Sequence, residues 1–303
     1  MMRVLVTGAN GFVGRALVKR LAEEGDDVLA VTRPGQRAAL AATGARVLEQ
    51  DMLAWSGPAR MRLDAVVHLA QSRRYREFPQ AAAQVSGVIA QGAVLAADLA
   101  CRSGATQLLY ASTGSLYAPG FAPVTEATPV TPRDFYARTK HCGEQLIEDF
   151  RKHFDLKIVR PFFIYGPGQR LPMIFPRLLE SVRNGAAITL DAAPGEDATA
   201  TGGLRFSPHY VDDHVECLVR LLRRPGHALL NLAGRQQTDI REVATVLGRL
   251  LGRTPELRSG ANARPGDFVV DTTCLTRTLG EVPSTTLEQG LSRVVAEARK
   301  AQS

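Results

Sequence analysis

Tyr136 and Lys140 are the residues whose types and spacing most directly suggest chemistry. They lie four positions apart in the segment FYARTK, and on a helix this spacing puts both side chains on one face. A free tyrosine titrates at about 10 and is a poor base near neutral pH. A lysine ammonium beside it favours the phenolate and so lowers the pKa of the tyrosine. The pair could then exchange a proton with a hydroxyl or carbonyl group.

A second candidate site lies in the N-terminal segment VLVTGANGFVG. Gly8, Gly11 and Gly14 stand at a spacing of three between an expected strand and an expected helix. Gly8 allows a tight turn, Gly11 lets the backbone approach a pyrophosphate, and Gly14 lets the helix pack against the strand. The helix N-terminus then offers N–H donors to the anion. The spacing differs from the standard G-x-G-x-x-G fingerprint, but the strand-turn-helix context predicts a dinucleotide site.

Alternating apolar runs and helical patterns must position these residues. Strands that are apolar along their whole length, each separated by a helix, favour an α/β fold with a Rossmann-type, doubly wound parallel sheet. Such a sheet binds ligands at the carboxyl ends of its strands. The expected strands are 3–6, 28–31, 46–48, 65–69, 107–111, 157–160 and 229–232. The expected helices are 13–24, 36–43, 81–102, 135–153, 212–223, 240–251 and 287–299.

The pattern changes after Gly166, where glycine, proline and polar residues become dense. Asp191–Gly203 is predicted to be a long loop. We therefore expect an NAD(P)-binding domain over residues 1–165, to which 207–235 return. A smaller C-terminal α+β domain, formed by 166–206 and 236–303, is expected to bind the substrate.

The glycine loop resembles that of the extended short-chain dehydrogenase/reductases, in particular the NAD-dependent epimerase/dehydratase family. The segment VVHLA at Val66–Ala70 matches the fourth-strand motif of the family, and the resemblance extends over essentially the whole chain. It implies that Tyr136 exchanges a proton as hydride moves to or from a nicotinamide, while Lys140 also holds the nicotinamide ribose. His68 is expected to be a packing residue. Besides Tyr136 and Lys140, the implied cofactor-binding residues are Gly8, Asn10, Gly11, Phe12, Val13, Gly14, Arg33, Asp51, Met52, Leu69, Ala70 and Pro161.

The family resemblance also implies a third catalytic residue on the turn after the fifth strand, ASTGSLYA. Matching the family pattern backward from Tyr117 puts the catalytic Ser or Thr at Thr113, with Ser112 as the neighbouring register. Sugar-nucleotide dehydratases of the family follow this position with Asp-Glu. Gly114 and Ser115 stand there instead, which counts against dehydration.

The substrate side of the resemblance implies a nucleotide sugar. GLRFSPHYVDD and ARPGD match two family motifs that place Arg205 and Arg264 on a diphosphate and Asp267 near the nucleotide ribose. An arginine fork suits phosphate oxygens. Phe163 departs from the asparagine that nucleotide-sugar epimerases often have there. We expect hydride transfer by a 4-keto sugar reductase or a 4-epimerase.

The end of the second strand predicts the cofactor preference. NAD enzymes of this fold place an acid there to bind the adenosine ribose. That position is Thr32, followed by Arg33 and, one helical turn on, Arg37. A guanidinium attracts a 2′-phosphate, which predicts NADP(H) over NAD(H), although Arg33 could instead stack on adenine. Two alternative functions stay open: an NADPH-dependent carbonyl reductase of a non-nucleotide substrate, and a non-catalytic NADP-sensing regulator. Such regulators often lack the tyrosine and lysine.

Composition narrows the remaining classes. The chain is 45% hydrophobic and 22% charged, as in soluble globular proteins. Its net charge is 37 − 30 = +7, but the basic residues are scattered, so no nucleic-acid partner is expected. The four cysteines form no C-x-x-C pair, and no metal site is expected. No apolar run approaches a membrane span, and a cytoplasmic protein is expected. Family analogy suggests a possible homodimer through helices 81–102 and 135–153.

Overall fold

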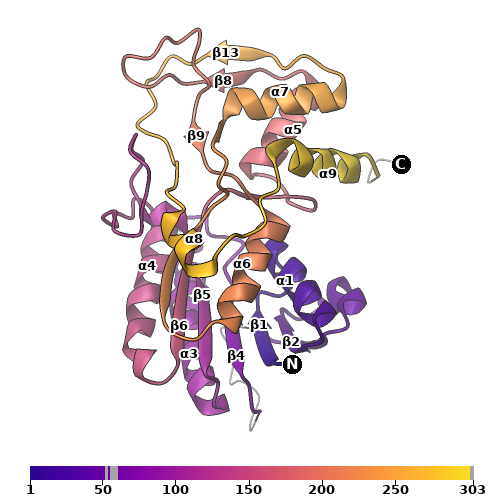
Figure 1. The fold of residues 1–303 in the computed structure, drawn as a ribbon, viewed down its shortest axis with the longest axis vertical. Helices are drawn as coiled ribbons and strands as arrows, with labels where there is room; N and C mark the ends of the chain where they lie inside the picture. The colour runs from indigo at the N-terminus through magenta and orange to yellow at the C-terminus, as the bar shows by residue number, and fades with distance from the viewer. Residues whose placement is uncertain (52–53, 55–60, 301–303) are drawn as a thin grey trace. The chain divides into compact units, whose positions relative to one another are not determined.

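The computed structural model describes residues 1–51, 54 and 61–300 and contains one large sheet (Figure 1). Within these residues its order is β11-β6-β5-β4-β1-β2-β3. The neighbouring pairs from β6 to β3 are parallel, and the order reverses between β1 and β4. The strands are β1 Arg3–Thr7, β2 Asp27–Thr32, β3 Arg46–Glu49, β4 Ala65–His68, β5 Gln107–Ala111, β6 Asp155–Pro161 and β11 Ala228–Leu232. This is the predicted doubly wound fold, and its switch point lies beside the glycine loop.

Helices cover both faces of this sheet (Figure 1). One face carries α3 and α4, which pack against each other. The other carries α1 and α6, which an ion pair between Arg20 and Glu216 joins. The helices of this part are α1 Phe12–Glu23, η1 Arg37–Thr43, α2 Ala82–Ser86, η3 Gly87–Gln91, α3 Gly92–Ser103, η4 Gly114–Leu116, α4 Phe135–Glu148, η5 Asp149–Lys152 and α6 Val211–Arg223. The predicted helix over 135–153 therefore ends earlier, and its last turn has 3-10 geometry.

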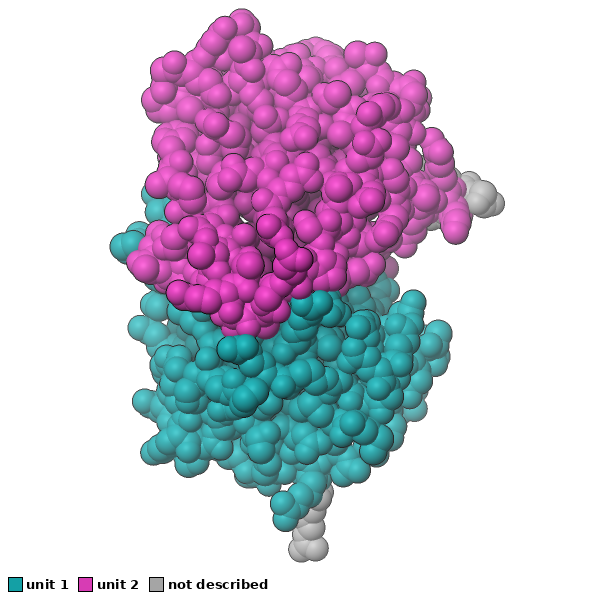
Figure 2. All heavy atoms as spheres, viewed as in Figure 1, with its two compact units in different colours: residues 1–118, 129–161, 215–230 teal, residues 119–128, 162–214, 231–303 magenta. Residues whose placement is uncertain are grey.

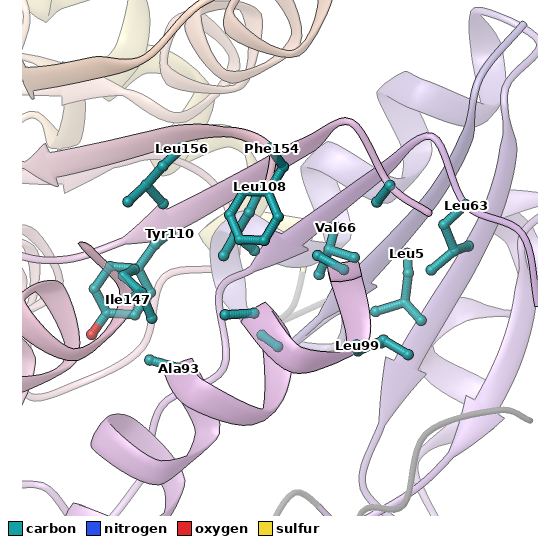
Figure 3. Close-up of a cluster of buried hydrophobic side chains, with 14 of the residues drawn as sticks. Leu5, Leu63, Val66, Ala93, Leu99, Leu108, Tyr110, Ile147, Phe154 and Leu156 are labelled. Carbon is teal, nitrogen blue, oxygen red and sulfur yellow. The ribbon is translucent and has the colours of Figure 1, made fainter. Parts of the chain in front are cut away.

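The core under α3 and α4 forms where strand and helix side chains meet (Figure 3). Leu5, Val66 and Leu108 point from three neighbouring strands toward Leu99 of α3, and all four are at most 2% exposed. Burying a leucine or valine side chain stabilises a fold by about 1.5–3 kcal/mol. The central strands are therefore fixed by continuous apolar contact, which holds their carboxyl ends in register.

The elements α2, η3 and α3 form one continuous helical stretch with a wider π turn at Gly87–Gln91. By length and composition, Ala82–Ser103 could cross a membrane, which corrects the expectation that no apolar run has that length. Half of its most apolar window is buried inside the protein. Ala96, Leu99 and Ala100 pack in the core shown in Figure 3, as in the core helix of a sheet protein.

The remaining segments build a second, mixed α and β part. In it, β8 pairs in parallel with β13, β7 in parallel with β10, and β9 antiparallel with β12. Helix α7 packs against both α5 and α9. The elements are β7 Ile164–Tyr165, α5 Ile174–Asn184, β8 Ile188–Leu190, β9 Arg205–Phe206, β10 His209–Tyr210, β12 Thr238–Asp239, α7 Ile240–Leu251, β13 Leu257–Ser259, α8 Thr273–Leu279 and α9 Leu287–Lys300. The predicted loop 191–203 contains none of these elements.

The chain divides into two compact units (Figure 2). The first comprises residues 1–118, 129–161 and 215–230, and the second 119–128, 162–214 and 231–303. The boundaries predicted from the sequence differ most from these at 119–128, which they assign to the first domain. This segment joins the second unit because Gly120 bridges Asp267 and Val124 bridges Val270.

Candidate active site

The glycine loop of the first unit is packed too closely for side chains. Gly8 has φ +66°, and a Cβ there would lie 2.8 Å from the backbone of Leu69 and Ala70. A Cβ on Gly14 would lie 2.2 Å from the carbonyl oxygen of Gly8. Helix α1 begins directly after Gly11 without a side-chain cap. Its first amides therefore fit an anion such as a dinucleotide pyrophosphate.

The other predicted cofactor residues gather mostly at the carboxyl ends of the same strands. The amides of Leu69 and Ala70 donate to the backbone and hydroxyl oxygens of Thr7. Asn10 Nδ2 donates to Gln36 Oε1 at 2.9 Å. Phe12 and Val13 open α1, Pro161 ends β6, Arg33 follows β2, and Asp51 lies two residues beyond β3. Met52 lies outside the described residues.

Helix α4 presents the predicted catalytic pair. Asp134 Oδ1 accepts a hydrogen bond from Ala137 N at 2.7 Å and so fixes the first turn of the helix. Burial raises the pKa of Tyr136, and hydrogen bonding by the side chain of Thr113 acts in the opposite direction with a smaller effect. Lys140 follows one turn later on the same helix. All three predicted catalytic residues therefore come from the first unit, and the side chain of Thr113 is near enough to Tyr136 to influence its pKa.

Lys140 makes a different contact from the one expected. Its Nζ donates to the carbonyl oxygen of Ala111 at 2.6 Å and lies 5.3 Å from the centre of the Tyr110 ring. Burial lowers the pKa of Lys140 to about 7, with Glu144 acting in the opposite direction. Burial raises the pKa of Tyr136 above its ordinary value. The lowered pKa that the sequence predicts for Tyr136 is therefore not found in the protein alone, because desolvation is the largest influence on its hydroxyl and disfavours the phenolate.

Two residues that sequence reasoning missed complete the surroundings of Tyr136. The tyrosine hydroxyl donates to Gln71 Oε1 at 3.1 Å, and the ring of Tyr75 packs at 4.8 Å between centroids. Both residues follow β4, the strand next to β5. Polar residues just after a parallel strand are the available signal, since strand ends of this kind form the ligand site.

Ser112 and His68 take other roles in the same region. The hydroxyl of Ser112 is buried and makes no hydrogen bond within the described structure, whereas the neighbouring Thr113 reaches Tyr136. His68 is fully buried, stacks on Tyr110 and shares a 2.9 Å hydrogen bond with the hydroxyl of Thr7. Burial lowers the pKa of His68 to about 3. The imidazole is therefore neutral, in line with the packing role expected for it.

The second unit brings together the three residues predicted to bind substrate. Asp267 is buried, and its Oδ1 accepts hydrogen bonds from Arg205 N at 2.9 Å and Arg264 Nε at 2.8 Å. The guanidinium of Arg205 lies 3.3 Å from Oδ2 of Asp267, and its side chain is 53% exposed. Asp267 therefore orients both arginines and has little capacity left for a ribose hydroxyl.

Arg264 differs from Arg205 because its guanidinium is enclosed. Only 4% of its side chain is exposed, and it forms ion pairs with Asp267 and Glu196. It also donates to the carbonyl oxygen of Asp191 at 3.1 Å. The loop between β8 and β9 thus supplies a carboxylate at the place where a diphosphate contact was predicted. Arg205 remains the more accessible cation of the two.

Phe163 adopts a backbone conformation that favours other residues. Its φ is +38°, in the left-handed region where asparagine is tolerated and bulky residues are strained. The ring packs at 4.6 Å from Phe206 and 6.0 Å from Phe268. An asparagine, the residue expected at this position, would suit this backbone better, and packing against Phe206 and Phe268 holds Phe163 in place.

A comparison with known families gives the assignment. The sequence model of the NAD dependent epimerase/dehydratase family matches residues 4–233 of this chain. The chain belongs to this family. It is accordingly an NAD(P)-dependent enzyme of the short-chain dehydrogenase/reductase class, as the glycine loop and the Tyr-x-x-x-Lys helix indicated.

Similar members of the epimerase/dehydratase family cover nearly the whole chain. An uncharacterized UDP-glucose epimerase, YtcB of Bacillus subtilis (strain 168), is 26% identical over 97% of both chains. A UDP-glucose 4-epimerase of Mycolicibacterium smegmatis is 28% identical, also over 97% of both. The solved structure of MoeE5 in complex with UDP-glucose and NAD is 26% identical and covers 99% of this chain and all of MoeE5, with a TM-score of 0.83.

Proposed function

We propose that this protein transfers hydride at a ring carbon of a nucleotide-activated sugar, as a 4-epimerase or a 4-keto sugar reductase. The observation that carries the proposal is that α4 holds Tyr136 and Lys140 one turn apart against the end of β5. There Lys140 Nζ donates to the carbonyl oxygen of Ala111, and Thr113 follows two residues later. The relatives support the substrate class, because they include a UDP-glucose 4-epimerase and MoeE5 bound to UDP-glucose.

Each side chain of the site has a task in such a reaction. Thr113 donates to the reacting oxygen and holds it beside Tyr136. Tyr136 takes the hydroxyl proton during oxidation and returns it during reduction. Lys140, when protonated, stabilises the phenolate and can hold a ribose hydroxyl with its remaining N–H donors. A bound nicotinamide dinucleotide supplies or accepts the hydride.

The second unit supports a phosphate contact through Arg205. Its exposed guanidinium is oriented by Asp267, and a fixed fork of donors matches phosphate oxygens. We assign Arg264 a supporting part, because its donors go to Asp267, Glu196 and the loop backbone. In this proposal Arg264 holds the loop 191–203 and Asp267 in place while Arg205 meets the substrate.

We propose NAD(H) as the cofactor. Arg33, which predicted NADP(H), is exposed and forms no hydrogen bond or ion pair among the described contacts. The comparisons give the NADP(H) preference no support, since MoeE5 was solved with NAD. Retained NAD also favours the epimerase, because an epimerase returns the hydride to the same substrate and consumes no reduced cofactor.

The deciding experiment separates the two reactions by their cofactor balance. Purified protein is incubated with UDP-glucose and NAD⁺, and the sugar nucleotides are separated by anion exchange. Appearance of the 4-epimer without net NADH formation supports the epimerase. Stoichiometric oxidation of NADH or NADPH by a nucleotide-linked 4-keto sugar supports the reductase. Absence of both reactions across uridine, thymidine and guanosine diphosphate sugars would contradict the proposed function.

A second candidate function is that of a carbonyl reductase acting on a non-nucleotide substrate. Two features of the second unit favour it. Phe163 gives the second unit an aromatic side chain where an asparagine was expected, and Glu196 neutralises Arg264. Both changes weaken binding of a diphosphate and suit an apolar substrate. Oxidation of NADPH by aromatic aldehydes and ketones, with no response to nucleotide sugars, would support this candidate.

A further inference from the structure

The turn after β2 is closed by a carboxylate from the neighbouring strand. Glu49 is the last residue of β3 and stands opposite Thr32, the last residue of β2. Its Oε1 accepts hydrogen bonds from the backbone N–H groups of Gln36 at 2.9 Å and Arg37 at 3.1 Å. Two backbone donors that converge in a turn form an anion-binding position. In this protein Glu49 fills that position.

This carboxylate is connected to the cofactor loop. The side chain of Gln36 accepts a hydrogen bond from Asn10 Nδ2 at 2.9 Å, and Asn10 stands between Gly8 and Gly11. In parallel sheets of this fold, the adenosine ribose binds at the end of the second strand. Asn10, Gln36 and Glu49 thus form one hydrogen-bonded chain across the place where the ribose is expected, all within the first unit.

The two arginines near this turn are not equivalent. Arg37 Nη2 donates to the carbonyl oxygen of Val47 at 2.9 Å, so its side chain lies back along β3. Arg33 is exposed and forms none of the described hydrogen bonds or ion pairs. The sequence-based prediction of cofactor preference rests on the end of β2, where Thr32 and Arg33 stand and a carboxylate is lacking, and the one acid expected near β3 is Asp51. The acid comes from β3 and is found only through the strand pairing.

We infer that Glu49 selects NAD(H) against NADP(H), an inference that rests on the nicotinamide dinucleotide site of the proposed function. A ribose 2′-hydroxyl can donate a hydrogen bond to the Glu49 carboxylate. A 2′-phosphate can only accept at that point, would meet a like charge at close range, and would compete for the amides of Gln36 and Arg37. Arg33 attracts the phosphate from the solvent side, where screening weakens its effect.

The test uses Glu49→Gln, which keeps an oxygen acceptor for both amides and removes only the charge. NAD⁺ and NADP⁺ are titrated calorimetrically against wild type and variant in the absence of sugar. Wild type is expected to bind NAD⁺ at least about tenfold tighter, a ratio equal to 1.4 kcal/mol. The variant should bind NADP⁺ about tenfold tighter than wild type does, with little change for NAD⁺. Glu148→Gln, which alters an exposed glutamate paired with Arg151 in the same unit, is the matched control and should leave both affinities unchanged.

A second measurement needs no variant and covers the case in which Glu49→Gln fails to fold. Adenosine 2′,5′-bisphosphate should bind wild type more weakly than 5′-AMP at low salt, and the gap should narrow as salt screens the repulsion. Tighter binding of the bisphosphate, a wild-type preference for NADP⁺, or an equal shift of both cofactors in Glu49→Gln would overturn the inference. None of these measurements involves a sugar substrate, so failure of the nucleotide-sugar proposal would leave this result standing, and the reverse also holds.

Discussion

The carboxylate of Glu144 accepts two hydrogen bonds from the guanidinium of Arg160, at 3.0 Å from Nε and 2.6 Å from Nη2. Both side chains are less than a tenth exposed. Arg160 also donates to the hydroxyl of Tyr117 at 2.7 Å, so a buried pair joins α4 to β6 and to the turn after β5. Because α4 carries Tyr136 and Lys140, this pair fixes the position of the catalytic helix.

Arg160→Met is expected to destabilise the protein strongly. Removing one partner of a buried ion pair leaves an uncompensated charge and typically costs about 3–5 kcal/mol. The free energy of unfolding, measured by urea titration, should fall by that amount. Arg151→Met is the control, because its pair with Glu148 is exposed and should contribute less than about 1 kcal/mol. Equal losses of unfolding free energy in the two variants would show that the buried pair with Glu144 stabilises the protein no more than an exposed pair does.

Tyr136→Phe should abolish turnover while leaving cofactor binding nearly intact, because only the proton-transfer group is lost. Thr113→Ala should reduce kcat by about ten- to a thousandfold, as expected for a lost hydrogen bond to the reacting oxygen. Steady-state rates with a nucleotide sugar test both variants. Ser112→Ala is the matched control, since its hydroxyl makes none of the described hydrogen bonds. Near-normal turnover by Tyr136→Phe would refute the mechanism, and a larger loss in Ser112→Ala would move the catalytic register to Ser112.

Features set by local periodicity could be predicted from the sequence. Tyr136 and Lys140 share a helix face because four residues span about one turn. Gly8 and Gly14 indicate close backbone contacts because glycine, which has no side chain, is the residue that fits where a Cβ would clash. The central strands follow from unbroken apolar runs. The sequence analysis does not predict helix α5, although Phe175, Leu178, Leu179 and Val182 repeat at helical spacing. It describes the chain after Gly166 only by its dense glycine, proline and polar residues.

Features that depend on contacts distant in sequence could not be predicted in this way. Gln71 reaches Tyr136 across 65 positions, and Glu196 reaches Arg264 across 68. Neither pair has a spacing that a single sequence reveals. The raised pKa of Tyr136 was missed for a related reason, since desolvation depends on the whole surroundings and not on the lysine alone.

The two arginines of the second unit should respond differently to replacement. Arg205→Ala should raise the KM for a nucleotide sugar by about ten- to a hundredfold, matching a charge-assisted contact of roughly 1.5–3 kcal/mol. Arg264→Ala should also raise KM, but it should lower the unfolding free energy as well, because Asp267 and Glu196 lose their shared cation. Arg258→Ala, at an exposed arginine of the same unit, is the control. An unchanged KM in Arg205→Ala would contradict the proposed phosphate contact and would favour the carbonyl reductase of a non-nucleotide substrate.

The buried ammonium of Lys140 predicts a pH dependence of stability with a definite sign. Its pKa is about 7 in the folded protein and near 10.5 when the chain is unfolded. Between these values the unfolded chain holds a proton that the folded protein has released, so stability rises with pH. Below pH 7 both states are protonated and the folded state bears the full cost of the buried charge. Relative to Lys140→Met, wild type should therefore gain about 2 kcal/mol of unfolding free energy from pH 7 to pH 9, at about 1.4 kcal/mol for each fully developed pH unit. Urea titrations of both proteins across this range measure the gain, and Lys19→Met, at an exposed lysine of α1, should run parallel to wild type. A difference that stays flat or falls with rising pH would show that Lys140 keeps its proton in the folded protein, held by the carbonyl of Ala111 and the carboxylate of Glu144.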